Sequence, residues 1–129
     1  TGQFVCNIAT WDLREQLNKT SAPVPAEIDE MQFAGLTAAP SQLVRPPRVA
    51  EAPIHLECEH YQTIDLPFNG KGRNSLCIGH VVGIHISESV LTDGLVDMAK
   101  LRPIARLGYH EFTSVESVFK MTRPTAKDL

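Results

Sequence analysis

The clearest pattern in the chain is an alternation of apolar and polar residues that begins at residue 54. One face of this segment carries Ile54, Leu56 and Cys58, and the other carries His55, Glu57 and Glu59. Such alternation predicts a long β-strand with one face turned to solvent. A second strand-like segment runs from about Ser75 to Ser87, after the glycine-containing stretch 67–73. Together the two segments predict an antiparallel hairpin with a seven-residue loop.

The second strand of this hairpin contains two glycines, Gly79 and Gly83, which strict alternation places on the same face. Glycines in a strand favour a bend, a bulge or the close approach of another backbone, and a barrel needs such bends. The apolar faces of the hairpin predict that its buried positions include Ile54, Leu56, Cys58, Ile78, Val82 and Ile84.

Shorter elements flank the hairpin. We expect a strand over residues 4–9, followed by a short helix that starts at a capping-box-like pair, Asp12 and Glu15, and ends at 18–23. A second helix is predicted over 26–34 with Gly35 as its left-handed end, a helical turn or two over 97–101, and a loose polar end over 122–129. A proline-rich stretch, 23–53, contains enough apolar residues to indicate a connector that packs on the core.

Composition limits the classes of function. The 129 residues are 43% hydrophobic, which suits one domain with a core, and their net charge of −3 with scattered basic residues argues against nucleic-acid binding. No apolar run approaches the roughly 20 residues that span a bilayer, and the N-terminus lacks a secretion-signal pattern, so we expect a cytoplasmic protein. The three cysteines sit among apolar residues, which favours reduced, buried thiols.

Candidate chemistry is sparse. The pairs His55 with His60 and His80 with His85 are each five residues apart, so on a strand their members face opposite sides and predict no metal site. No nucleophile elbow or locally placed base occurs, so we predict no catalytic nucleophile. The loop at 69–73 joins two strands rather than a strand and a helix, so a hairpin tip is favoured over a phosphate cradle.

The segment 106–112 is the best candidate for a binding site. Arg106 supplies a fixed cation, Gly108 allows close backbone approach, and Tyr109 and His110 supply an aromatic face and an imidazole. The alternative is a surface turn before the final element. Composition alone favours this alternative.

The order of several motifs favours a binding site. In this order the chain resembles the flavin-reductase-like, FMN-binding split-barrel family. The resemblance is to the branch that includes flavoredoxin and the reductase component of nitrilotriacetate monooxygenase. It is carried, in chain order, by Gly2–Thr10, Leu17–Ser21, Ile28–Met31, Ala34–Thr37, Arg45–Val49, Glu51–Pro53, Leu56–Cys58, Ile78–Ile86, Asp93–Gly94, Leu101–Tyr109, Phe119 and Arg123–Pro124.

The resemblance implies a mainly β protein, a Greek-key split β-barrel with short helices. It implies a homodimer that binds FMN, accepts hydride from NAD(P)H without a dedicated catalytic residue, and has a monooxygenase as a candidate partner. The implied cofactor-binding residues are Asn18, Thr20, Ser21, Arg106, Gly108, Tyr109 and His110.

One departure from the family pattern qualifies this picture. The chain starts with Thr1-Gly2-Gln3 directly before an apolar strand, where family members carry further N-terminal strands with much of the flavin site. We therefore expect residues 1–129 to be the C-terminal portion of a single flavin-reductase-like domain. The alternatives are a non-catalytic relative with the FMN-binding fold and a cofactor-free β-barrel module for interaction or dimerisation.

Overall fold

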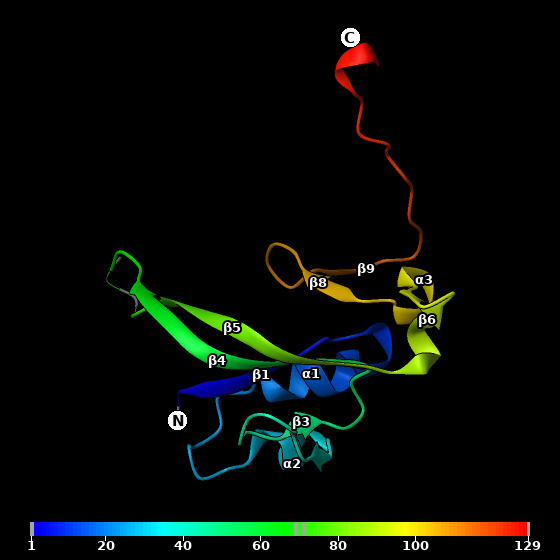
Figure 1. The fold of residues 1–129 in the computed structure, drawn as a ribbon. Helices are drawn as coiled ribbons and strands as arrows, with labels where there is room; N and C mark the ends of the chain where they lie inside the picture. The colour runs from blue at the N-terminus through cyan, green and yellow to red at the C-terminus, as the bar shows by residue number, and fades with distance from the viewer. Residues whose placement is uncertain (1, 69, 71, 129) are drawn as a thin grey trace.

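A long antiparallel hairpin forms the centre of the computed structural model, which describes residues 2–68, 70 and 72–128 (Figure 1). Strands β4 (Ile54–Asp65) and β5 (Ser75–Ile86) pair along their whole length, and β1 (Gln3–Asn7) adds to β4, giving the order β1-β4-β5. The predicted hairpin and first strand are confirmed. Part of the predicted loop, Asn69 and Lys71, lies outside the described residues.

The hairpin is bent by two irregularities in its register. Glu57 pairs with Gly83 but Cys58 pairs with Val81, and a second shift lies between His60 and Gln62. A Cβ built on Gly83 would lie 3.7 Å from the Cβ of Glu57, and one built on Gly79 would lie 3.2 Å from that of Cys58. Because Glu57 and Cys58 are successive strand residues that face opposite sides, the two glycines do too. Val82 lies between Gly83 and Val81 and has no partner on β4. This extra residue changes the alternation of β5, so the prediction that both glycines share a face was wrong.

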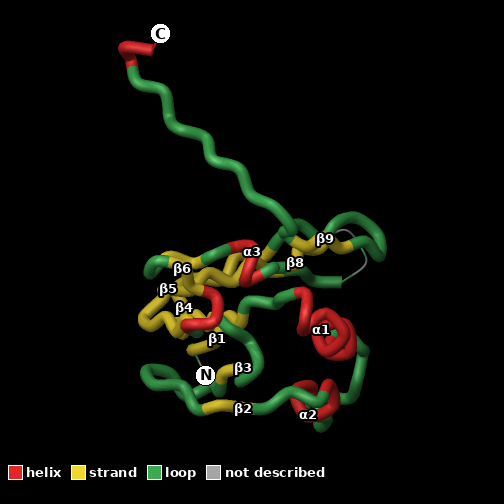
Figure 2. Tube along the Cα trace, turned by 90° about the vertical axis from the view of Figure 1, so that its right-hand side faces the viewer, coloured by secondary structure: helices red, strands yellow, loops and turns green. Residues whose placement is uncertain are grey.

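The prediction that one side of β4 faces solvent was also wrong. His55 is 6% exposed and Glu57 is 0% exposed. The covering segment is the proline-rich connector, which contains β2 (Ala38–Ala39) and β3 (Arg48–Val49) and lies beneath the sheet in both views (Figures 1 and 2). The connector packs against the fold as predicted, but the face that it covers was not predicted.

Two short helices follow β1 and lie on the connector side of the sheet. A 3₁₀ turn, η1 (Trp11–Leu13), leads into α1 (Arg14–Thr20), and α2 is limited to Glu30–Ala34. No side-chain capping bond is made at the start of η1 or α1, so the capping-box prediction was wrong. The start of α2 is instead capped by Asp29, and Gly35 ends it at φ 76°, as predicted.

The rest of the chain returns across the other side of the sheet. It contains η2 (Glu88–Val90), the small hairpin β6 (Leu91–Thr92) with β7 (Leu95–Val96), and α3 (Met98–Leu101), where a helical turn was predicted. Ile54, Val90 and Leu101 form the buried cluster, with Ile8 packed against it. The core is therefore small and lies where the base of the long hairpin meets α3.

The last paired strands are β8 (Ile104–Arg106) and β9 (Phe112–Ser114). Residues 115–125 have no helix or strand and lead away from the sheet to η3 (Ala126–Asp128) (Figures 1 and 2). Side chains on this segment are open to solvent, with exposed fractions of 62% for Val118 and 84% for Phe119.

Several burial predictions are corrected. Ile54 and Cys58 are buried, and Leu56, Ile78 and Val82 are half-buried, but Ile84 is 60% exposed. All three cysteines are free, as expected, yet Cys6 and Cys77 are exposed and only Cys58 is buried. Across the described ranges, no helix has the length and apolar character needed to cross a membrane.

Candidate functional site

A candidate site is formed by a cleft of about 520 Å³ that separates α1 from the β8–β9 hairpin. Its volume lies in the range of about 300–1,000 Å³ typical of small-molecule sites. Residues of η1 and α1, together with Ser21 directly after α1, form one wall, and residues of β8, β9 and their connecting turn form the other. The lining comprises Trp11, Arg14, Glu15, Leu17, Asn18, Thr20 and Ser21 on the first wall, and Ile104, Arg106, His110, Phe112 and Thr113 on the second.

This cleft brings together most of the residues that the resemblance implied. Its lining includes Asn18, Thr20 and Ser21 at the end of α1, and Arg106 and His110 some ninety positions later in the sequence. Gly108 and Tyr109 do not line it. Tyr109 lies at the tip of the β8–β9 turn with φ 55° and is 91% exposed.

The hydroxyl groups at the end of α1 are held by the helix itself. Thr20 Oγ1 donates to the carbonyl of Leu17 at 2.8 Å, and Ser21 Oγ donates to the carbonyl of Asn18 at 2.6 Å. These bonds satisfy carbonyls that the helix end leaves without intrahelical partners. Each hydroxyl oxygen keeps lone pairs that can accept a hydrogen bond from a ligand.

Arg106 is fixed by the turn that follows it. Its Nη2 donates to the carbonyl of Tyr109 at 2.5 Å, and its Cζ lies 5.2 Å from the centre of the Phe112 ring. Two backbone bonds close the turn, from Leu107 N–H to the Glu111 carbonyl and from Glu111 N–H to the Gly108 carbonyl. The guanidinium therefore enters the cleft wall in a defined position.

Trp11 and Arg14 are two of the cleft residues that the sequence did not predict as part of a site. Trp11 is 39% exposed, and the Cζ of Arg14 lies 4.2 Å above the centre of its ring. Arg14 Nη1 also donates to the Trp11 carbonyl at 2.8 Å. Their spacing of three residues is the available signal, because residues three apart on a helical segment are neighbours.

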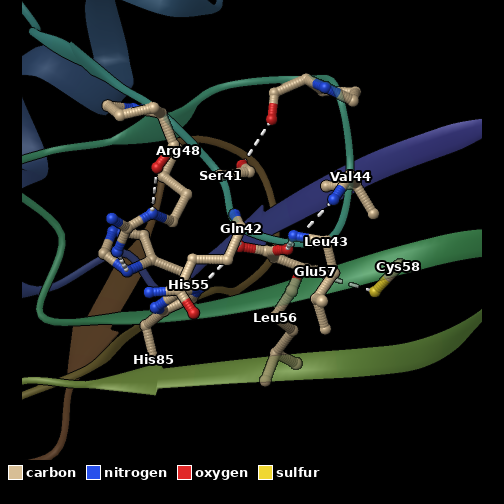
Figure 3. A network of polar contacts seen from close by, with 12 residues as sticks. Ser41, Gln42, Leu43, Val44, Arg48, His55, Leu56, Glu57, Cys58 and His85 are labelled. Carbon is tan, nitrogen blue, oxygen red and sulfur yellow. Dashed lines mark hydrogen bonds and ion pairs between the residues drawn. The ribbon is translucent and has the colours of Figure 1, made fainter.

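A second polar cluster lies between β4, β5 and the connector and surrounds the buried carboxylate of Glu57 (Figure 3). The Glu57 carboxylate accepts backbone N–H bonds from Gln42 at 2.8 Å, Leu43 at 2.6 Å and Val44 at 3.2 Å. It also contacts His85 Nε2 at 2.5 Å. Burial acts to raise the pKa of Glu57, but the bonds from Gln42, His85 and Leu43 outweigh it and lower that pKa to about 2.

His55 extends this cluster toward β3. Its Nε2 lies 2.7 Å from the Val49 carbonyl, which makes Nε2 the protonated nitrogen, and its Nδ1 lies 3.5 Å from Arg48 Nη1. Burial is the main cause that lowers the pKa of His55. Because every group faces a partner inside the fold, we assign this cluster to holding the connector against the sheet.

A cavity of about 240 Å³ lies between β1, α1 and α2, where Gln16 Oε1 is buried with no hydrogen-bond partner among the described residues. Within the same residues, no group of three or more His, Cys, Asp or Glu side chains is placed to hold a metal ion. The cleft beside α1 therefore remains the main candidate for binding.

The structure combines a mainly β architecture and short helices with a cleft lined by arginine, aromatic and hydroxyl side chains. The family model described as "Flavin reductase like domain" matches residues 1–105. The chain therefore belongs to the flavin-reductase-like family.

Individual relatives agree with this assignment. A protein of Halalkalibacterium halodurans is 36% identical over 127 residues, which are 96% of this chain and 60% of that protein. The structure of nitrilotriacetate monooxygenase component B from Bacillus cereus is 30% identical with a TM-score of 0.85, over 93% of this chain and 60% of that one. Flavoredoxin of Desulfovibrio vulgaris (Miyazaki F) is 23% identical with a TM-score of 0.80, over 98% and 65% of the two chains, and shows the fold alone.

These comparisons confirm the predicted fold, a mainly β split barrel of the flavin-reductase type. The chain spans about 60% of the length of the first two of these relatives. The comparisons do not assign the residues that contact a ligand.

Proposed function

We propose that the protein is an FMN-binding, NAD(P)H-dependent flavin reductase and that its flavin site includes the cleft between α1 and the β8–β9 hairpin. The observation that supports this most is the convergence of Asn18, Thr20, Ser21, Arg106 and His110 on one cleft. The resemblance implied these residues from sequence, and they come from two segments far apart in the chain. A surface turn with no function would not require them to meet.

The chemistry expected of the cleft is positioning. Bound FMN would supply the ring that accepts hydride from the nicotinamide. The side chains present would orient that ring: Arg106 contributes positive charge, Thr20 and Ser21 contribute acceptor oxygens, and Asn18 offers an amide. This mechanism needs no general acid or nucleophile.

We also propose that the active unit is a homodimer with a monooxygenase as a candidate partner. Support comes from apolar side chains open to solvent, including Phe119 and Met121 at 84% and 85% exposure. The outer edges of β1 and β5 have no partner strand among the described residues. Sedimentation should show a dimer, and a stable monomer at high concentration would contradict this part of the proposal.

The flavin proposal is tested by titrating FMN and following its visible absorbance, then NADH and NADPH oxidation. We expect the 129-residue chain to bind weakly and a chain extended to the relatives' length to bind and turn over. If the extension contributes two charge-assisted contacts to FMN in addition to those of the cleft, their loss weakens binding by about two to four orders of magnitude. Tight FMN binding by the 129 residues alone would contradict the expectation that part of the flavin site lies outside them.

A variant tests the place of the site. In the extended chain, Arg106→Gln should weaken flavin or nicotinamide binding by roughly tenfold or more. Arg45→Gln makes the same change of charge on an exposed side chain outside the cleft and should leave binding unchanged. Normal turnover by Arg106→Gln would remove the β8–β9 wall from the site.

A further inference from the structure

Two arginines, one on each wall of the cleft, are held in place by the same combination of contacts. Arg14 donates to the carbonyl of Trp11 at 2.8 Å and lies 4.2 Å from the centre of that residue's ring. Arg106 donates to the carbonyl of Tyr109 at 2.5 Å and lies 5.2 Å from the Phe112 ring. Each guanidinium is thus tied to one backbone carbonyl and one aromatic ring of its own wall.

This arrangement prepares both arginines to bind an anion. A guanidinium stacked on a ring keeps its planar set of N–H donors directed to the side, where phosphate oxygens can be reached. Arg14 uses Nη1 in its hydrogen bond to Trp11 and Nε in its ion pair with Glu15, and its Nη2 donates to no group among the described residues. Because contacts within the fold already restrain the side chain, a ligand has less side-chain entropy to remove.

The charge balance of the cleft favours the same ligand. The charged side chains that line it are Arg14, Arg106 and Glu15. Glu15 Oε1 lies 3.6 Å from Arg14 Nε and its side chain is 73% exposed, so the pair is strongly screened by solvent. The two guanidinium groups therefore exceed the single carboxylate in a site that also offers aromatic surface from Trp11 and Phe112.

We propose that Arg14 and Arg106 form a subsite for a phosphate monoester carried by a ligand with a planar ring, and that Trp11 positions Arg14. Two ligands of the proposed reaction carry such a group: FMN through its 5′-phosphate and NADPH through the 2′-phosphate of its adenosine. The inference rests on the proposed function only in its choice of these ligands. The subsite adds Arg14 and Trp11 to the residues that the resemblance implied.

The test uses two matched pairs of probes on the extended chain, with affinities measured by calorimetry. FMN is compared with riboflavin, and adenosine 2′,5′-bisphosphate is compared with adenosine 5′-monophosphate. We expect Arg14→Gln to weaken the member with the additional phosphate in one pair by roughly ten- to a hundredfold. Its partner in that pair should change by less than about twofold. The pair that responds identifies the source of the phosphate.

Further variants separate this role from a structural one. Arg45→Gln is the charge-matched control outside the cleft. Glu15→Gln removes the competing carboxylate and should strengthen binding of the same phosphorylated probe. Trp11→Ala should weaken it severalfold, and Trp11→Phe should retain most of the affinity because a ring remains under Arg14. Far-ultraviolet circular dichroism verifies that each variant is folded.

Tryptophan fluorescence gives a second readout, because Trp11 is the only tryptophan of the 129 residues. The difference between the wild type and Trp11→Phe isolates its signal, which should change on addition of the responding probe. The subsite would be overturned if Arg14→Gln weakened the affinity for both members of a pair equally. It would also be overturned if Arg14→Gln left the affinity for every probe unchanged. Failure of the wild type to bind either flavin would overturn the proposed function, whereas the adenosine pair would still decide the subsite.

Discussion

The Glu57 cluster and the α1 cleft contain similar residue types but differ in how completely their polar groups are paired. Glu57 has no solvent exposure and accepts three backbone N–H bonds as well as a contact from His85. In the cleft, Arg14 and Arg106 each have a partner on their own wall and keep donors for another. Complete internal pairing is typical of a structural role, whereas donors left at the surface of a cleft are typical of a binding role.

The largest effect on stability is expected from removing the buried carboxylate of Glu57. Glu57→Ala leaves the N–H groups of Gln42, Leu43 and Val44 without their acceptor beside a new cavity. We expect the Tm to fall by on the order of 10 °C or more, measured by calorimetry. Glu59→Ala, at an exposed position on the same strand, should change the Tm by only a degree or two. A similarly small shift for Glu57→Ala would refute the assignment of the Glu57 cluster to holding the connector against the sheet.

Low pH is the second way to distinguish the Glu57 cluster from the α1 cleft. The folded-state pKa of Glu57 is lowered from 4.5 to about 2, so its stabilisation is present above pH 4.5 and is lost as the pH falls toward 2. Urea midpoints measured across this range should fall for the wild type. Glu57→Gln should be less stable at pH 7, and its midpoints should fall less steeply between pH 4.5 and 2.

His55 adds an earlier acid effect. Burial lowers its pKa from 6.5, so the unfolded chain takes up this proton first and the fold loses stability as the pH falls below 6.5. His55→Gln should flatten the urea midpoints between pH 6.5 and 5. An unchanged slope in that interval would show that His55 is not buried in its neutral form.

The two hairpin glycines provide a finer test, because they compare the packing on the two faces of the hairpin. A Cβ at Gly79 would lie 2.4 Å from Cζ of Phe4, whereas one at Gly83 would lie 3.0 Å from the terminal Cδ1 of Leu43. Leu43 is 58% exposed and can move, so Gly83→Ala should have little effect. Gly79→Ala should cost about 1–3 kcal/mol in chemical unfolding, because the ring of Phe4 must shift. Equal effects would show that the Phe4 ring moves freely.

The smallest stability effects are expected in the cleft. Ser21→Ala and Asn18→Ala change exposed groups and should alter the unfolding free energy by about 0.5 kcal/mol or less. The same variants should weaken flavin binding measured by titration if the proposed site is right. A stability loss comparable to that of Gly79→Ala would place these residues with the structural region instead.

The success of the sequence reasoning varied with the range of the interactions involved. The β4–β5 hairpin was predicted closely because alternation is a local signal, and Gly35 was correctly predicted as a helix end because its positive φ suits glycine. The capping box at Asp12 and Glu15 failed because the chain forms a 3₁₀ turn there. Trp11 and Arg14 were missed because their importance depends on β8 and β9, which follow about ninety residues later.

Local sequence was enough to predict the elements that depend on neighbouring residues: the long strands, the end of α2 and the helical turn at α3. The order of the motifs was enough to predict the family. Which side chains become buried or face one another depended on the tertiary packing. It turned Glu57 from an expected surface residue into the most buried charge of the described chain, because a connector from residues 38–49 covers it. It also set Arg106 opposite α1. Alternation specifies that two faces differ, whereas burial depends on segments that pack from far along the chain.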